Sequence, residues 1–143
     1  PLSGEMSGHV CYADDFYGYD DAMYVGLRLL RILGNKNKNL HDIINKYPKT
    51  FSTPETRFDV DEIKKFKIID EIKERLLSFE GNIIDIDGIR VETEEGWFLM
   101  RASNTQNQLT CRVESTSKNG LKKLIDIVEN QLQLSNVNFK FTI

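Results

Sequence analysis

The sequence of 143 residues has little cysteine, little proline and no long hydrophobic run. Its two cysteines, Cys11 and Cys111, lie far apart, and two cysteines do not form a disulfide framework in a chain of this length. We therefore predict that both thiols are reduced and that Cys111 lies in the core. No apolar stretch approaches the roughly 20 residues that span a bilayer, and no secretory signal occurs. We expect a cytoplasmic protein without a membrane partner.

Positive charge is also scarce, since 19 Lys and Arg residues face 22 Asp and Glu residues and the formal net charge is -3. No run of Lys and Arg occurs that could follow a nucleic-acid backbone, so nucleic acid is not an expected partner. The content of 40% hydrophobic and 29% charged residues is typical of a globular protein. Because the chain begins at Pro1 with a polar, glycine-flanked loop, its start resembles a cut in a longer protein.

The first strongly periodic segment runs from Asp20 to about Leu33 and predicts a helix that is apolar around most of its circumference. Asp20 or Asp21 can cap its start, and Gly34 with Asn35 can end it. Such a helix needs apolar partners. We predict that it packs on the second domain, associates with another copy of the chain, or stays partly mobile.

A domain boundary is expected near residue 50. A short helix around Leu40 to Lys46 precedes Pro48, and Ser52-Thr53-Pro54 is typical of a linker. The sequence therefore predicts two parts, residues 1–50 and residues 51–143.

The second part alternates between helical and strand patterns. The Asp87-Gly88 pair between two alternating runs predicts a β-hairpin with a tight type I′ turn. With the strands that follow, it predicts a two-layer α+β domain, in which helices cover one face of a four-stranded antiparallel sheet. The expected elements are a strand candidate at 56–60, a helix at 61–79, the hairpin at 82–93, strands at 97–101 and 109–114, and a helix at 117–134.

A polar loop, Arg101-Ala102-Ser103-Asn104-Thr105, lies between the last two predicted strands. Arg101 offers a planar fork of donors, and Ser103 and Thr105 offer hydroxyls. Asn104 adds an amide, and a turn here can aim backbone N–H groups at one point. This composition suits a phosphate-binding loop. The alternative is an ordinary inter-strand loop whose side chains satisfy their own backbone, and composition alone does not decide between the two.

A second polar loop, residues 4–9, reads Gly-Glu-Met-Ser-Gly-His. The Glu5 carboxylate accepts hydrogen bonds and the Ser7 hydroxyl donates or accepts them, which suits the vicinal hydroxyls of a sugar. His9 can act as a general acid or base or donate to a ligand, although a single histidine beside a strand is more often structural. On its own this loop is a weak signal.

Other polar groups are not interpreted as sites. Asp85-Ile86-Asp87-Gly88 resembles the start of a calcium loop, but the later ligands are missing and the hairpin accounts for it. We assign Asp20 and Asp21 to helix capping, and Asp14 and Asp15 to solvent. The sequence has no serine-protease triad, Walker loop or zinc-ligand spacing, so no metal site is expected in this chain.

Taken in this order, the two loops resemble those of the α-D-phosphohexomutase family, in its phosphomannomutase/phosphoglucomutase branch. Residues 4–9 resemble the sugar-specificity loop of the family's third domain, and residues 101–105 resemble the phosphate-binding loop of its fourth. Segments 52–55 and 82–88 also resemble family segments, so the likeness runs nearly from end to end.

The resemblance implies that residues 1–50 are the C-terminal remnant of the third, α/β domain and that residues 51–143 are the complete fourth domain. It also implies a conversion of hexose 1-phosphate to hexose 6-phosphate through a bisphosphate intermediate. The family uses a phosphoserine in its first domain and Mg²⁺ held by aspartates in its second.

Neither the serine loop nor the metal loop of the family occurs in this sequence. Phosphoryl transfer needs both a donor and charge neutralisation by a metal, so the chain is expected to be inactive by itself. Its implied partners are hexose phosphates, the missing N-terminal domains and, through the apolar helix, another copy. Hexose 1,6-bisphosphate is the implied intermediate or activator.

By position, the resemblance implies a role for seven side chains. Because the intermediate must turn over, the grip on the phosphate that is not reacting should not depend on which carbon carries it. The sugar would be held by Glu5, Ser7 and His9, with His9 a possible auxiliary in proton transfer, and the phosphate by Arg101, Ser103, Asn104 and Thr105.

Two further positions bear on the branch and on loop rigidity. Met6 and Asn104 resemble the mannose/glucose branch rather than the glucosamine branch. The family commonly has proline two residues after the loop threonine, where this chain has Asn107, and proline would stiffen the exit from the loop.

The competing interpretation is a free-standing, non-catalytic module that binds anions or proteins with the same fold. The apolar helix at 22–33 favours a piece of an α/β domain over such a module. An RNA or DNA binder would need a basic, aromatic sheet face, which the alternating Glu, Thr and Asp positions do not supply.

Overall fold

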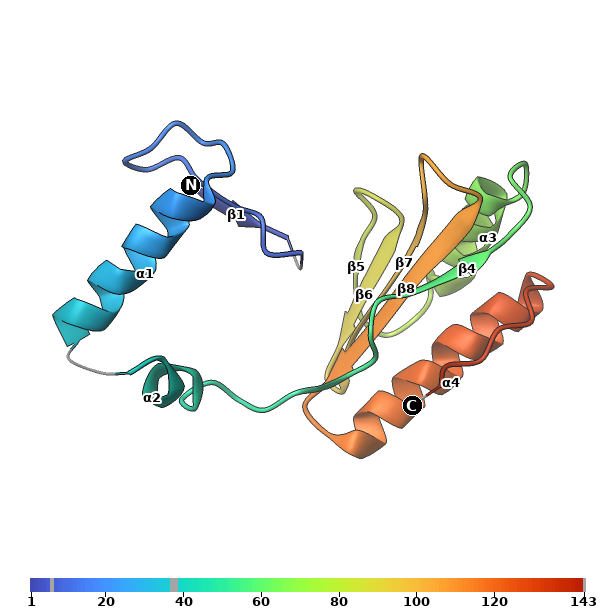
Figure 1. The fold of residues 1–143 in the computed structure, drawn as a ribbon. Coiled ribbons are helices and arrows are strands. Elements are labelled where there is room, and N and C mark those ends of the chain that lie inside the picture. The colour runs from blue at the N-terminus through green and yellow to red at the C-terminus, as the bar shows by residue number, and fades with distance from the viewer. Residues whose placement is uncertain (6, 37–38, 143) are drawn as a thin grey trace. The chain divides into compact units, whose positions relative to one another are not determined.

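The computed structural model describes residues 1–5, 7–36 and 39–142, which form two compact units, Pro1–Pro48 and Lys49–Ile143 (Figure 1). The first unit opens with two short antiparallel strands, β1 (Leu2–Gly4) and β2 (Val10–Tyr12). The sequence does not predict this hairpin, because strands of three residues are too short to show a period of two.

Two helices complete the first unit. Helix α1 (Ala22–Lys36) begins where the Asp21 carboxylate accepts the backbone N–H of Tyr24 at 2.9 Å, so capping by Asp21 is confirmed. Its predicted end is wrong, because the helix continues through Gly34, whose φ is not positive, so no left-handed cap forms there. The short helix α2 (Leu40–Ile44) is confirmed, and Asn39 caps it.

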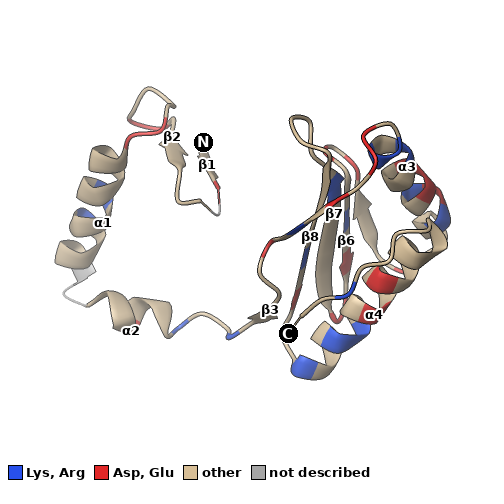
Figure 2. Ribbon diagram, turned by 45° about the vertical axis from the view of Figure 1, so that its right-hand side comes forward, with Lys and Arg blue, Asp and Glu red and all other residues tan. Residues whose placement is uncertain are grey.

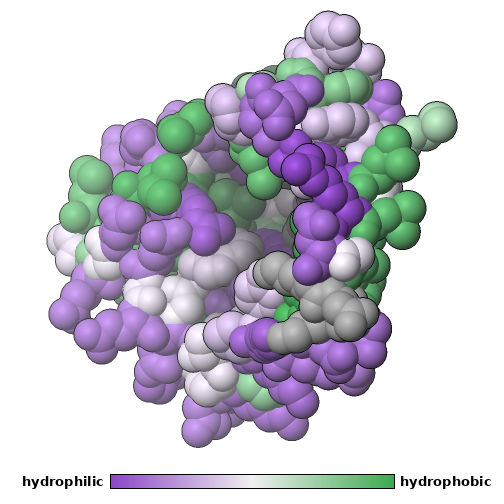
Figure 3. Space-filling model, turned by 90° about the vertical axis from the view of Figure 1, so that its left-hand side faces the viewer, coloured by the Kyte–Doolittle hydropathy of each residue, from purple (hydrophilic) through white to green (hydrophobic). Residues whose placement is uncertain are grey.

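Helix α1 leaves much of its apolar surface uncovered within the first unit. Met23 is 82% exposed, and Leu27 and Leu30 are each 64% exposed. The inner side of the helix contacts the preceding loop, where the rings of Phe16 and Tyr24 stack with 3.9 Å between centroids. Figure 3 shows hydrophobic residues reaching the surface beside hydrophilic ones.

The second unit contains an antiparallel six-stranded sheet in the order β3-β8-β7-β6-β5, with β4 also paired to β8. The prediction of four strands is therefore corrected. The buried Thr53 hydroxyl accepts the Val113 N–H at 3.1 Å, and Pro54, which has no N–H, divides the outer edge into two short strands. The strands are β3 (Phe51–Ser52), β4 (Thr56–Asp59), β5 (Asn82–Ile84), β6 (Ile89–Thr93), β7 (Gly96–Ala102) and β8 (Gln108–Ser115).

Helices α3 (Lys65–Leu76) and α4 (Lys118–Leu134) cover one face of this sheet, so the predicted two-layer α+β class is confirmed (Figure 1). The core between the layers includes Phe98 and Cys111, both fully buried, as predicted for the cysteine. Burial raises the pKa of the Cys111 thiol to about 12.

The tip of the β5–β6 hairpin differs from the prediction. Residues 85–88 connect the strands, and Gly88 has φ +85° while Asp87 is not left-handed, so the turn is not type I′. A Cβ on Gly88 would lie 2.4 Å from the Met100 carbonyl oxygen. The glycine therefore permits a close approach of the hairpin tip to β7.

Charges of both signs are spread over the helices of the second unit, with lysines in the first half of α4 and acidic residues further along (Figure 2). Among the helices that the structure describes, none has the length and apolarity to cross a membrane.

Candidate functional site

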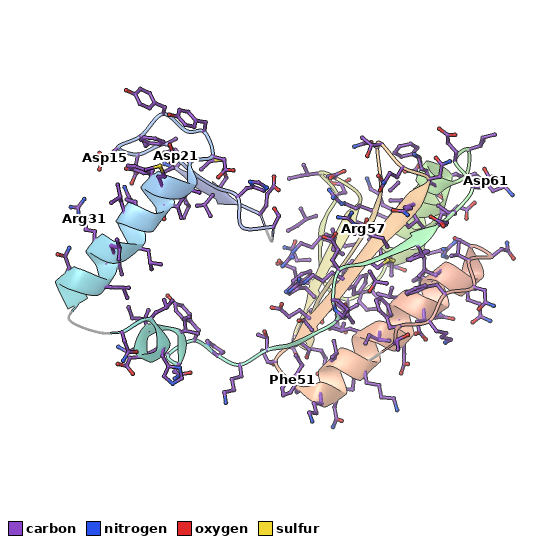
Figure 4. All side chains as sticks on the ribbon, viewed as in Figure 1. Asp15, Asp21, Arg31, Phe51, Arg57 and Asp61 are labelled. Carbon is purple, nitrogen blue, oxygen red and sulfur yellow. The ribbon has the colours of Figure 1, made fainter. Side chains whose placement is uncertain are left out.

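A row of polar side chains crosses three neighbouring strands of the second unit. Thr110 on β8 is the register partner of both Arg57 on β4 and Arg101 on β7. Neighbours of the row such as Met100 and Cys111 point into the core. Since side chains alternate along a strand, Arg57, Thr110 and Arg101 project from the face without helices. Figure 4 labels Arg57 on its strand.

The row leads into a small pocket of about 130 Å³ at the loop between β7 and β8. A liquid water molecule occupies about 30 Å³, so the pocket has room for a small anion such as a phosphate group. Its charged lining residues are two arginines, with no carboxylate among the described residues that line it. The lining consists of Arg57, Arg101, Ser103, Thr105, Gln106, Gln108 and Thr110.

The predicted phosphate loop is thus partly gathered around one pocket. Arg101, Ser103 and Thr105 line it, whereas Asn104 is not among the lining residues. Arg57, which lies far from the loop in sequence, was not predicted, because its alternation with Phe58 gives only a strand signal. Pairing between β4 and β8 brings it to the site.

Within the loop, the Ser103 hydroxyl oxygen accepts backbone N–H groups from Gln106 at 3.1 Å and from Thr105 at 3.4 Å. The Ser103 N–H in turn donates to the Gln108 carbonyl at 2.9 Å. This is the local bonding that the ordinary-loop interpretation expects. The point at which these two N–H groups converge is the Ser103 hydroxyl oxygen itself, and the hydroxyl keeps its own proton for a ligand.

Each arginine is held by a carboxylate that does not line the pocket. Arg101 Nη1 donates to Asp87 at the hairpin tip at 3.0 Å, and Arg57 donates to Glu55 through Nε at 2.9 Å and Nη2 at 2.7 Å. A guanidinium has five N–H donors, so both groups retain donors for an anion. The two carboxylates orient the guanidinium groups without lining the pocket themselves.

The predicted sugar loop lies in the first unit, between β1 and β2, and is described separately. The Ser7 hydroxyl donates to Glu5 at 3.0 Å, so the two predicted sugar ligands contact each other. The interpretation of Met6 lies outside the described residues. Glu5, Ser7 and His9 are all exposed within this unit.

His9 is paired rather than free. Its Nδ1 lies 2.5 Å from a carboxylate oxygen of Asp20, and the other oxygen of Asp20 accepts the Val10 N–H at 3.2 Å. This hydrogen bond raises the pKa of His9 and lowers that of Asp20. The prediction that Asp20 caps α1 is therefore wrong.

Asp14 is exposed, as predicted, and it also forms an ion pair. Asp14 lies 2.7 Å from Nη2 of Arg28, which lowers the pKa of its carboxyl. Arg28 in turn lies over the Tyr12 ring, 4.4 Å from its centroid. This ion pair fastens the loop before α1 to the helix.

Among the described residues, no group of three or more His, Cys, Asp and Glu side chains is arranged to hold a metal ion.

Two family models match the chain. The model described as "Phosphoglucomutase/phosphomannomutase, C-terminal domain" matches residues 55–131, and the model described as "Phosphoglucomutase/phosphomannomutase, alpha/beta/alpha domain III" matches residues 1–51. The chain belongs to the phosphoglucomutase/phosphomannomutase family.

Individual relatives agree with this assignment. The chain is 39% identical over 132 residues to a phosphomannomutase/phosphoglucomutase of Pseudomonas aeruginosa, an alignment that covers 92% of this chain and 28% of the relative. It is 39% identical over 126 residues to a phosphoglucomutase of Neisseria meningitidis, covering 86% and 27%.

A solved structure shares the fold along nearly the whole chain. The crystal structure of a phosphoglucomutase/phosphomannomutase family protein from Burkholderia thailandensis matches with a TM-score of 0.84 and 36% identity. The match covers 99% of this chain and 30% of that one. The chain thus spans less than a third of the length of the relatives that it matches.

Proposed function

We propose that this chain provides the phosphate grip and part of the sugar site of an enzyme that interconverts hexose 1-phosphates and hexose 6-phosphates. The observation that carries the proposal is the pocket at residues 101–105, which is sized for a phosphate and whose charged lining is two arginines. The names of the relatives support hexose phosphates as the substrate class.

In this proposal each lining group has a defined task. Arg101 and Arg57 approach the phosphate from two strands, so their forks can each form paired hydrogen bonds to its oxygens. The Ser103 and Thr105 hydroxyls donate to the remaining oxygens, with Asn104 at the rim of the loop. The site would hold the end of the substrate that is not reacting.

The first unit would supply hydrogen bonds to the sugar. Glu5 and Ser7 suit adjacent hydroxyls because one accepts and the other donates. His9, whose positive form is favoured by Asp20, would donate to a ligand oxygen or assist a proton transfer. Mannose and glucose are the proposed hexoses, and a cytoplasmic location follows the same proposal.

The chemistry itself would lie outside this chain. Phosphoryl transfer requires a donor in line with the acceptor and a cation to neutralise charge. We propose a phosphoserine and Mg²⁺ in the missing domains, with hexose 1,6-bisphosphate as the intermediate. This chain would position substrate and show no mutase activity alone.

A ligand panel tests the phosphate grip. Isothermal titration should give similar affinities, within about threefold, for mannose 1-phosphate and mannose 6-phosphate, with weaker binding of inorganic phosphate and no binding of unphosphorylated mannose. Equal binding of both esters is expected because the pocket recognises the phosphate and not its position on the ring.

The alternative is an anion-binding or protein-interaction module with this fold. It is favoured by the hydrophobic core that the second unit contains by itself. If sulfate and unrelated polyanions bind as tightly as the hexose phosphates, or if only free sugar binds, the substrate assignment fails.

A further inference from the structure

A buried lysine lies directly behind the predicted phosphate loop. Lys65 is the first residue of α3 and is only 4% exposed, although its side chain ends in an amino group. Its Nζ donates to the backbone carbonyl of Gln106 at 2.9 Å, across a separation of 41 residues. Gln106 itself lines the arginine pocket.

This ammonium group lacks the partner that buried charges usually have. In residues 1–5, 7–36 and 39–142, no carboxylate lies within ion-pairing distance of Lys65. The ring of Phe66 contributes a weak attraction, with its centroid 5.2 Å from Nζ. Burying a charge is costly unless it is compensated, and one carbonyl satisfies one of three donors.

The lysine also fixes the shape of the loop. Gln106 is held through its carbonyl by Lys65 and through its N–H by Ser103. The next carbonyl, that of Asn107, accepts the Val60 N–H at 2.8 Å. The exit from the loop is therefore anchored by two hydrogen bonds, one from Val60 before α3 and one from Lys65 at the start of α3.

We propose that Lys65 is a positioning residue of the phosphate site, which holds the loop at Gln106 and supplies a buried positive charge that a bound phosphate compensates. The inference rests on the proposed function of the loop. A lysine retained only to fill space would need neither its charge nor its hydrogen bond, since a long apolar side chain packs as well.

Three substitutions separate charge, hydrogen bond and volume. Lys65→Met keeps a long side chain and removes both charge and donor, Lys65→Arg keeps both, and Lys65→Gln keeps a neutral donor. Lys122→Met is the matched control, because Lys122 is an exposed lysine in α4. The probe is inorganic phosphate, and the readouts are its dissociation constant at several salt concentrations and the NMR carbonyl shift of Gln106.

Lys65→Met should weaken phosphate binding about tenfold and move the Gln106 carbonyl signal, whereas Lys65→Arg should restore binding to within about threefold of the unmodified chain. Lys122→Met should change neither readout. Binding by Lys65→Met as tight as that of the unmodified chain would overturn the proposal.

If Lys65→Met does not fold, the comparison of Lys65→Arg with Lys65→Gln tests the proposal instead. Lys65→Arg must bind phosphate more tightly than Lys65→Gln, and equal affinities would overturn the role of the charge. Failure of the proposed function has a different signature: the unmodified chain itself would not bind phosphate or hexose phosphates, and the inference would fall with it.

Discussion

At the scale of single residues, this chain uses carboxylates to orient cationic side chains around both loops. Asp87 and Glu55 hold the two arginines of the proposed phosphate site, and Asp20 holds His9 in the proposed sugar loop. In each case the carboxylate fixes one side of the cation and leaves other donors available. An oriented donor loses less conformational freedom when a ligand binds.

The His9–Asp20 pair has a pH dependence whose sign follows from the two pKa shifts. The pKa of His9 is raised from its ordinary value of 6.5. The contribution of His9 to the stability of the fold is therefore fully present below pH 6.5 and is lost as pH rises through the raised pKa. The pKa of Asp20 is lowered, so the contribution of Asp20 to stability is lost as pH falls through the lowered pKa. Asp20→Asn should return the NMR midpoint of the His9 ring toward 6.5.

Glu5→Gln is the control for this titration, because Glu5 is the smallest contributor to the His9 shift. It should lower the midpoint less than Asp20→Asn does. An unchanged His9 midpoint in Asp20→Asn would show that the pair does not form in solution.

At the scale of elements, the sequence predicts the helices and strands that are long enough to show a hydrophobic period. The apolar faces of α3 and α4 and the alternating residues of β7 and β8 are sufficient to predict a layer of helices packed on a layer of strands. Short strands such as β1 and β3 carry too few residues to show a period. The site shows the same limit, because Arg101 and Ser103 belong to a local motif, whereas Arg57 and Lys65 reach the loop only through tertiary contacts.

The approach of the hairpin tip to β7 gives a prediction at this scale. Gly88→Ala should destabilise the second unit by about 2 kcal/mol or more, because Gly88 has φ +85° and the added Cβ would meet the Met100 carbonyl at 2.4 Å. Urea unfolding followed by the fluorescence of Trp97, the single tryptophan, measures this.

Gly26→Ala provides the matched control, since a Cβ at Gly26 meets nothing within 4 Å. It lies inside α1 and should stabilise that helix by up to about 1 kcal/mol. Equal stability of the Gly88→Ala variant and the unmodified chain would contradict the close approach.

At the scale of the whole molecule, the two units differ in their cores. The buried apolar side chains of the described chain all lie in the second unit, from Ile68 to Leu132. The first unit instead leaves Met23, Leu27 and Leu30 of α1 exposed within itself. The first unit should therefore be less stable against local unfolding than the second, because cooperative protection of backbone amides depends on buried contacts.

Amide hydrogen exchange tests this inequality. Amides of α1 should exchange at least about a hundredfold faster than those of α4 at low protein concentration. Protection of α1 that rises with concentration would support association with another copy of the chain. Equal protection in α1 and α4 at all dilutions would contradict the account of an unsupported helix.

The central claim, a phosphate grip at residues 101–105, is tested most directly by a two-dimensional amide NMR titration with mannose 1-phosphate and, separately, with inorganic phosphate. We predict saturable shifts at Ser103, Asn104 and Thr105 with both ligands, weakened about tenfold or more in Arg101→Ala and unchanged in Lys122→Ala. If millimolar ligand leaves these amides unmoved while the fold is intact, or if Arg101→Ala binds as the unmodified chain does, the claim is contradicted.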